Sequence, residues 1–448
     1  MARMPRPLRL RPAPLVIAAA FVALAALSSP ALAVHIQEVR SPGGIAAWLV
    51  EEHGIPLVAL EATFRGGAAL DPPGKEGLAN MAATLLDEGA GDLDSQAYHA
   101  RLEDLSIRLG ADAGRDDLTI GLQTLKANEA EAFRLLALAL TAPRFDADAV
   151  TRVRGQIEAE LGRESDEPHA VASRTFWRTL FPDHPYGRPA AGTPESVARI
   201  AVEDLRTVAK SRLARGNLVI GVVGDITAAE LAPLLDRTFG ALPADSAAAE
   251  PTEVRPEAGG QATIVERDVP QSTVLFGQRG PKRENPEWYA AEVVIHILGG
   301  GTTSRLFQEV REKRGLAYSV WTALAPLDHA GLIQGGLGTE NAHVDESIER
   351  IRAEFRRLRD EGPTQAELDA AKTYLTGSFP LRFDSTAHTA RILVAMQLDH
   401  LGIDYIERHD GLIAAVTLDE ARKFARETLD PDHLTFIVVG KPGKGNPS

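Results

Sequence analysis

One β-rich phrase occurs twice in this chain and limits its fold more than any other feature. The first copy spans residues 217–224 (NLVIGVVG), and the second spans residues 433–440 (HLTFIVVG) at the far end of the chain. A similar helical phrase precedes each copy, at residues 202–205 and at residues 417–420. Solenoid repeats recur every ~20 to 50 residues, so this much longer period indicates a duplicated domain. We therefore predict two homologous domains.

Apolar periodicity predicts the same kinds of element in both halves. Alternating or continuous apolar runs predict strands at residues 57–64, 118–122, 217–224, 272–277, 331–337 and 433–440. Apolar residues spaced three or four apart predict helices at residues 95–109, 127–140, 147–161, 287–298, 344–358 and 365–375. Strands combined with runs of helices favour the α+β class, with a mostly antiparallel sheet and helices on one face in each domain.

Composition sets the domain bounds that we predict. Residues 34–241 form the N-terminal domain and residues 261–441 the C-terminal domain. Residues 242–260 are rich in Ala, Pro, Asp and Glu, which is typical of a linker. Residues 442–448 contain Gly and Pro and are expected to be a tail.

Residues 1–33 have the pattern of a secretory signal peptide. Four arginines precede an apolar run at residues 15–27, and the small-residue site Ala31-Leu32-Ala33 follows. An uncleaved membrane anchor is the alternative, but the apolar run is short for a membrane span. We predict cleavage after Ala33 and a periplasmic or secreted protein.

Charge and cysteine content exclude several classes of function. The chain has 48 basic and 62 acidic residues, and loss of residues 1–33 would leave 44 basic residues and a net charge of about −18. Such a surface argues against nucleic acid as a partner. The chain has no cysteine, so it forms no disulfide and has no thiolate metal site. No two of its twelve histidines are three to five residues apart, so no local zinc signature is present.

Residues 77–88 (GLANMAATLLDE) resemble the zinc-binding helix of the pitrilysin (insulinase) metallopeptidase family. That family has Gly-Leu-Ala, then His-x-x-Glu-His, then an apolar pair. Asn80, Ala83 and Thr84 stand where the family has its first His, its Glu and its second His. Zinc peptidases need three good protein ligands and an open site for water. The resemblance therefore implies that this chain holds no catalytic zinc and is inactive alone.

In this family a glutamate zinc ligand follows the second His of the motif, and Glu160 lies near that spacing after Thr84. The resemblance implies that Glu160 is a remnant of a zinc site whose other ligands are missing. The alternative is that Glu158, Glu160 and Glu164 form an ordinary solvated helix face.

Residues 299–320 (GGGTTSRLFQEVREKRGLAYSV) resemble the family's C-terminal signature. In complete members an Arg and a Tyr seven residues apart reach the active site, and here these are Arg311 and Tyr318. From composition alone both could be ordinary surface or core residues. The run Gly299-Gly300-Gly301 has no phosphate-loop pattern, and the resemblance implies at most a peptide contact there.

The resemblance covers residues 38–440 and is closest to small two-domain bacterial members that work as pairs of clam-like chains around a chamber. It implies a non-zinc subunit of a heteromeric zinc metallopeptidase. Arg311 and Tyr318 would bind the substrate backbone and the oxyanion, and a homologous partner would supply zinc and the base. The alternatives are a non-catalytic structural or peptide-binding protein, and an active homodimer with an unrecognised site.

Overall fold

The computed structural model describes residues 35–249, 251–257 and 259–443. The described residues from Ile36 onward form one compact unit. The predicted signal peptide and residues 444–448 of the predicted tail lie outside the described residues. The predicted domain bounds stay a prediction.

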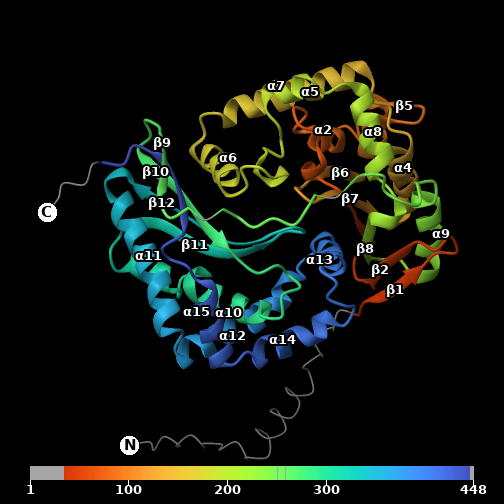
Figure 1. Ribbon diagram of the computed structural model, residues 1–448. Helices are drawn as coiled ribbons and strands as arrows, with labels where there is room; N and C mark the ends of the chain where they lie inside the picture. Colours follow the sequence, from red (N-terminus) through yellow and green to blue (C-terminus); the bar gives the residue numbers. More distant parts are fainter. Residues whose placement is uncertain (1–34, 250, 258, 444–448) are drawn as a thin grey trace, which may run out of the picture. The chain divides into compact units, whose positions relative to one another are not determined.

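The first half contains a six-stranded sheet, with the strand order β1-β2-β8-β3-β7-β6 (Figure 1). Its strands are β1 (Gln37–Arg40), β2 (Ala46–Glu51), β3 (Leu57–Arg65), β6 (Arg108–Ala113), β7 (Asp117–Leu125) and β8 (Leu218–Gly224), and a small hairpin is formed by β4 (Gly89–Ala90) and β5 (Leu93–Asp94). Its helices are α2 (Leu78–Thr84), α3 (Ser95–Asp104), α4 (Glu129–Thr141), α5 (Ala147–Glu164), α6 (Pro168–Leu180), α7 (Pro194–Ala198), α8 (Val202–Arg212) and α9 (Ala228–Phe239).

The second half contains a five-stranded sheet, with the strand order β11-β12-β10-β13-β9. Its strands are β9 (Ala262–Glu266), β10 (Gln271–Arg279), β11 (Ala317–Pro326), β12 (Gly331–Glu340) and β13 (Thr435–Gly440). Its helices are α10 (Trp288–Gly299), the π-helical segment η5 (Phe307–Glu312), α11 (Val344–Glu361), α12 (Gln365–Ser378), α13 (Thr386–Leu398), α14 (Tyr405–Ala415) and α15 (Leu418–Thr428).

The two sheets repeat one topology, which confirms the predicted fold class. The order β2-β8-β3-β7-β6 in the first sheet corresponds to β9-β13-β10-β12-β11 in the second. All pairs are antiparallel except β2 with β8 and β13 with β9. The repeated phrase of the sequence forms β8 and β13, each next to the central strand of its sheet.

The repeated helical phrase marks two helix N-termini. The Asp204 carboxylate accepts a hydrogen bond from the backbone N–H of Ala201 at the start of α8. Thr417 and Glu420 form a reciprocal capping box at the start of α15. Each satisfies backbone N–H groups that have no partner within the helix.

Each sheet is covered on one face by helices of its own half and on the other by one helix of the other half. Helix α13 packs on β3 and β8, and helix α6 packs on β10 and β13. Glycines allow both contacts, because a Cβ on Gly221 would lie 2.4 Å from the Ala390 carbonyl oxygen and one on Gly277 would lie 2.7 Å from the Phe176 ring. The exchange joins the halves into one unit.

The helix predicted at residues 95–109 is wrong at its C-terminal end. Helix α3 ends at Asp104, Ser106 adopts a positive φ of 52°, and Leu109 lies in β6 opposite Leu122. The leucine spacing fits a helix, but pairing with β7 decides the conformation of residues 108–113.

In the part of the chain that the structure describes, no helix is both long enough and apolar enough to cross a membrane.

Candidate functional site

A buried carboxylate positions helix α2, where the zinc motif was expected. Asp71 accepts hydrogen bonds from the backbone N–H groups of Gly77 (3.1 Å) and Ala79 (3.1 Å) at the start of the helix. Its side chain is 1% exposed and pairs with Arg212 at 3.0 Å. Burial raises the pKa of Asp71, and Arg212 opposes that rise. The start of α2 therefore depends on a buried ion pair.

The three motif positions on α2 do not fit a zinc ion. Ala83 is buried in the first hydrophobic core. The Thr84 hydroxyl donates a hydrogen bond to the Asn80 carbonyl oxygen at 2.9 Å, so it serves the helix itself. The half-buried Asn80 offers only an amide. No imidazole or carboxylate stands at these positions, so they lack the ligands that a catalytic zinc ion needs.

Glu160 lies on the exposed surface of α5. It forms an ion pair with Arg163, one turn later on the same helix, and its side chain is 55% exposed. Helix α5 does pack against α2. The side chain is nevertheless engaged on the helix surface, which agrees with the alternative of a solvated helix face.

Asp87, Glu88 and His99 form another group next to α2, with one polar atom of each within 4.8 Å of the others. The Glu88 carboxylate already accepts two hydrogen bonds from Arg152, at 2.9 and 2.5 Å, and one from Ser95. These bonds, those from Arg152 first, lower the pKa of Glu88 to about 2. The guanidinium occupies the place that a cation would take, so the group is an ion pair rather than a metal site.

Arg311 and Tyr318 do come together in the second half. The Arg311 guanidinium carbon lies 5.2 Å from the centre of the Tyr318 ring and 4.7 Å from that of Phe307. Tyr318 is 81% exposed and the Arg311 side chain is 38% exposed. The two residues therefore present a cation and a phenol side by side to solvent.

Irregular backbone presents both residues. Arg311 belongs to the π-helical segment η5, a conformation that is often found at functional sites. Tyr318 lies at a β-bulge, because Ala317 pairs with Thr339 and Ser319 pairs with the adjacent Gly338. A bulge turns a side chain away from the regular alternation of its strand. Strand β11 is also an edge strand of its sheet.

The glycine run has a structural explanation at two of its three positions. A Cβ on Gly299 would lie 2.5 Å from the Thr322 hydroxyl, and one on Gly300 would lie 2.4 Å from the His296 ring. Gly301 faces open space. Gly299 and Gly300 thus allow the end of α10 to pack closely, and only Gly301 is free to meet a ligand.

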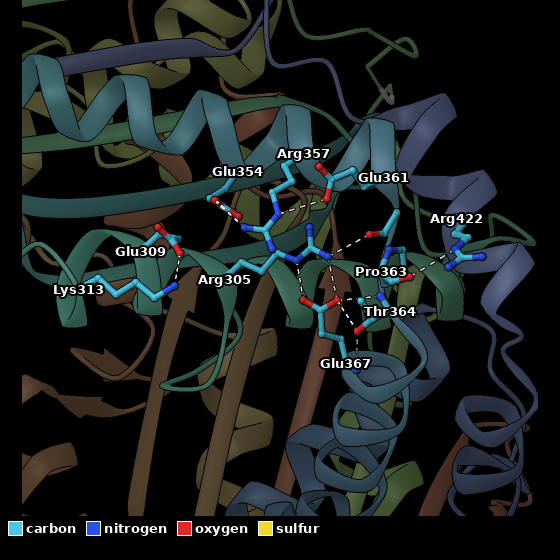
Figure 2. A network of polar contacts seen from close by, with 11 residues as sticks. Arg305, Glu309, Lys313, Glu354, Arg357, Glu361, Pro363, Thr364, Glu367 and Arg422 are labelled. Atoms are coloured by element: carbon cyan, nitrogen blue, oxygen red, sulfur yellow. Dashed lines mark hydrogen bonds and ion pairs between the residues drawn. The ribbon is translucent and has the colours of Figure 1, made fainter.

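Figure 2 shows the polar network that holds the segment leading to Arg311. Arg305 donates to both carboxylate oxygens of Glu367, at 2.6 and 2.8 Å, and to the Gly362 carbonyl at 3.0 Å. Glu367 also caps α12 through the backbone N–H of Thr364. The Arg305 side chain is 6% exposed. This network fixes the start of η5 against the turn between α11 and α12.

Further along η5, Glu309 accepts bonds from both Lys313 and Arg314. These bonds lower the pKa of Glu309. They engage two of the cations that surround Arg311, whose own ion contact, with Glu312, is long at 3.9 Å.

Two parts of the chain match models of one protein family. Residues 49–194 match the model described as Insulinase (Peptidase family M16), and residues 199–375 match Peptidase M16 inactive domain. The chain belongs to the M16 peptidase family. This confirms the resemblance found in the sequence, because insulinase is the other name of that family.

Some similar proteins are named as zinc proteases and others as inactive members of the family. A Helicobacter pylori protein named non-peptidase homolog YmxG is 29% identical, over 88% of this chain and 91% of its own length. An uncharacterized zinc protease of Mycobacterium leprae is 30% identical over 65% of this chain and 66% of that protein. The crystal structure of a peptidase M16 inactive domain from Pseudomonas fluorescens superposes with a TM-score of 0.86 at 27% identity, covering 92% of this chain and 99% of that one.

Sequence reasoning missed the buried pairs that hold both segments. The pattern Thr364-x-x-Glu367 before a helix could have identified a capping box, but not its link to Arg305. Nothing near Asp71 in the sequence points to Arg212, which lies on a helix much later in the chain. Both pairs depend on contacts between distant segments.

Proposed function

We propose that this chain is the non-zinc subunit of a heteromeric zinc metallopeptidase. One observation carries the proposal: the zinc-motif positions hold no ligand, whereas Arg311 and Tyr318 lie together and exposed. A family member that performed no peptide chemistry would have no evident need for that pair. The relative named a non-peptidase homolog agrees with a chain that is inactive alone.

In this proposal the chain provides hydrogen-bond donors to the reacting peptide. Attack on an amide carbonyl develops negative charge on its oxygen, and donors aimed at that oxygen lower the barrier. A guanidinium group such as that of Arg311 can donate two hydrogen bonds in one plane. The Tyr318 phenol donates a third. A homologous partner would carry the metal and the base that activate water.

The test is reconstitution with a His-x-x-Glu-His homologue from the same organism. The mixed chains are expected to cleave a quenched fluorescent peptide that neither chain cleaves alone. Arg311→Ala should lower kcat/KM about 100-fold and Tyr318→Phe about 10-fold, as loss of an oxyanion donor does. Activation by both variants at the wild-type level would exclude the composite site.

Two control variants match these residues in type and exposure. Arg408 on α14 is 46% exposed and pairs with Asp404, and Tyr374 on α12 is 56% exposed. Arg408→Ala and Tyr374→Phe should leave the activity of the mixture unchanged. A loss with these variants would point to a general effect of surface changes on assembly.

A non-catalytic structural or peptide-binding role is the other outcome of this test. Binding of the homologue without any cleavage, together with unchanged binding in Arg311→Ala, would favour it. Cleavage by this chain alone would instead favour an unrecognised site.

We also propose that the chain is exported, with its signal peptide cut after Ala33. The arginines and the apolar run within residues 1–33 support this. Cell fractionation and N-terminal sequencing test it, and a cytoplasmic chain that keeps Met1 would contradict it.

A further inference from the structure

A cavity of about 440 Å³ lies between the end of α5, helix α6 and the loop at residues 187–193. No part of the proposed function uses it. Its volume falls within the range of small-molecule sites, about 300–1,000 Å³. The lining includes four arginines, which are Arg115, Arg174, Arg178 and Arg188.

Among the described residues, three of these four guanidinium groups pair with backbone carbonyls or the Trp177 ring rather than with carboxylates. Arg174 donates to the Glu164 carbonyl at 3.1 Å, and Arg188 donates to the Asp71 and Ala69 carbonyls at 2.7 and 3.1 Å. Arg115 donates to the Tyr186 carbonyl at 3.3 Å. Within residues 35–249, 251–257 and 259–443, no ion pair of 4.0 Å or shorter joins any of the four to a carboxylate.

This local excess of positive charge contrasts with the net charge of the whole chain. The whole chain has a formal net charge of −14. The arginines discussed above, such as Arg152, Arg212 and Arg305, each pair with a carboxylate. The cavity has one acidic lining residue, Glu164. Uncompensated guanidinium groups around a cavity favour an anionic ligand, because they bind carboxylates through two parallel bonds.

The same cavity has an apolar wall. Leu161, Val171, Trp177 and Pro189 contribute to its lining. The Arg115 guanidinium carbon lies 3.7 Å from the centre of the Trp177 ring, and Phe181 stacks on that ring. Burial lowers the pKa of Arg115 to about 10, so its guanidinium is still charged at neutral pH. Apolar surface next to charge favours a ligand that has both.

We propose that this cavity binds a carboxylate that is attached to an apolar group. Two sources share this chemistry, the C-terminal residue of a peptide and a free organic acid. The guanidinium groups of Arg174 and Arg178 hold the carboxylate, and the apolar wall around Trp177 holds the hydrocarbon part. The site is independent of Arg311 and Tyr318.

Isothermal titration calorimetry on the purified chain tests this with four probes. They are N-acetyl-Ala-Ala-Leu with a free carboxylate, the same peptide as its amide, 4-methylpentanoate and inorganic phosphate. We expect the free acid to bind about tenfold or more tightly than the amide. Tighter binding of the peptide than of 4-methylpentanoate identifies a peptide terminus, and the reverse identifies a free acid.

Three results would overturn the proposal. The acid and the amide bind equally, neither organic acid binds, or inorganic phosphate binds as tightly as the better organic acid. Equal binding of acid and amide would mean that the carboxylate is not recognised. Absence of binding would mean that the cavity is not a binding site for these ligands. Tight phosphate binding would indicate a simple anion site in which the apolar wall has no role.

Variants assign the binding to this cavity. Arg178 is exposed, so the Arg178→Gln variant should fold normally. Its affinity for the more tightly bound organic acid should be about tenfold lower than that of the wild type. Arg174→Gln should do the same. Arg206 is a matched control, since it lies on α8 with a 50% exposed side chain. Arg206→Gln should bind as the wild type does. Wild-type affinity in Arg178→Gln would place the binding elsewhere and refute the assignment, even if Arg174→Gln failed to fold.

Discussion

The two halves of this protein share one topology but differ in what the segment after the central strand offers. After β3, helix α2 presents Asn80, Ala83 and Thr84, none of which is a metal ligand in this setting. After β10 and α10, the segment η5 and the bulged strand β11 present Arg311 and Tyr318 to solvent. The two halves therefore share one framework but present different side chains at corresponding places.

Both α2 and η5 are nevertheless held in place by an arginine–carboxylate ion pair. Arg212 pairs with Asp71 below α2, and Arg305 pairs with Glu367 beside η5. The first pair is deeply buried, with side chains 5% and 1% exposed, whereas Glu367 is 29% exposed. The first half, which contains the degenerate zinc motif, thus has the more buried ion pair.

The faces that receive the exchanged helices also differ. In the second half, α6 packs on apolar residues that include Leu275, Ile437 and Val439. In the first half, the face near α13 contains Glu61 and Thr63 and borders a cavity of about 640 Å³. The interface between α13 and the sheet of the first half is therefore the more polar of the two, and its stability should depend on pH.

The largest effect is expected from breaking the anchor of the first half. Arg212→Ala leaves the Asp71 carboxylate buried without its cation, and this costs roughly 3–5 kcal/mol of unfolding free energy. Urea unfolding followed by circular dichroism measures it. The exposed Arg206→Ala on the same helix is the control and should change stability by less than about 0.5 kcal/mol. Equal effects of the two variants would refute the importance of the buried pair.

The matching change in the second half should cost less. Arg305→Ala leaves Glu367 unpaired but partly hydrated, so we expect a loss of about 2 kcal/mol. It should also lower peptidase activity in the reconstituted mixture, because Arg311 loses its fixed position. Arg356→Ala, on the exposed face of α11, serves as the control. A cost above that of Arg212→Ala would reverse the proposed order of the two anchors.

The stability of the interface between α13 and the sheet of the first half should depend on pH through Glu61. Burial raises the pKa of Glu61 from the usual 4.5 to about 7, although Arg391 opposes the rise. Between pH 4.5 and 7 the folded chain therefore binds the proton more tightly than the unfolded chain does, so this group adds stability as pH falls through 7. Glu61→Gln should stabilise the protein by about 1–2 kcal/mol at pH 8 and by nearly nothing at pH 5.

Thermal and urea unfolding at both pH values check this prediction. Glu407 on α14 is exposed, and Glu407→Gln should show no difference between the two conditions. The same stability change for Glu61→Gln at pH 5 and pH 8 would show that Glu61 is not the titrating group.

The smallest effects are expected at the former zinc positions. Asn80→Ala and Thr84→Val should each change stability by less than about 1 kcal/mol. Among the described residues, Thr84→Val removes one hydrogen bond within the helix, and the Asn80 carbonyl that accepts it is backbone. Both should leave peptidase activity of the mixture at the wild-type level. A loss as deep as that of Arg311→Ala would mean that α2 still takes part in chemistry.

The sequence predicted the framework well because strand and helix periodicity are local signals. Strands β3, β7, β8, β10, β12 and β13 lie where alternation predicted them. The family signature also brought Arg311 and Tyr318 to attention before any geometry was known. The error at residues 105–109 arose because leucine spacing fits two conformations, and pairing with β7 chose between them.

By itself, the sequence determined the duplication, the α+β class, the family and the missing zinc ligands, since each is a property of residue order. Only the tertiary structure decided that α6 and α13 cover the opposite sheets and that buried pairs hold α2 and η5. It also decided that four arginines line one cavity with Trp177. These features join residues far apart in the chain. Their energies depend on burial and on distances between partners, and no local pattern of residues specifies either.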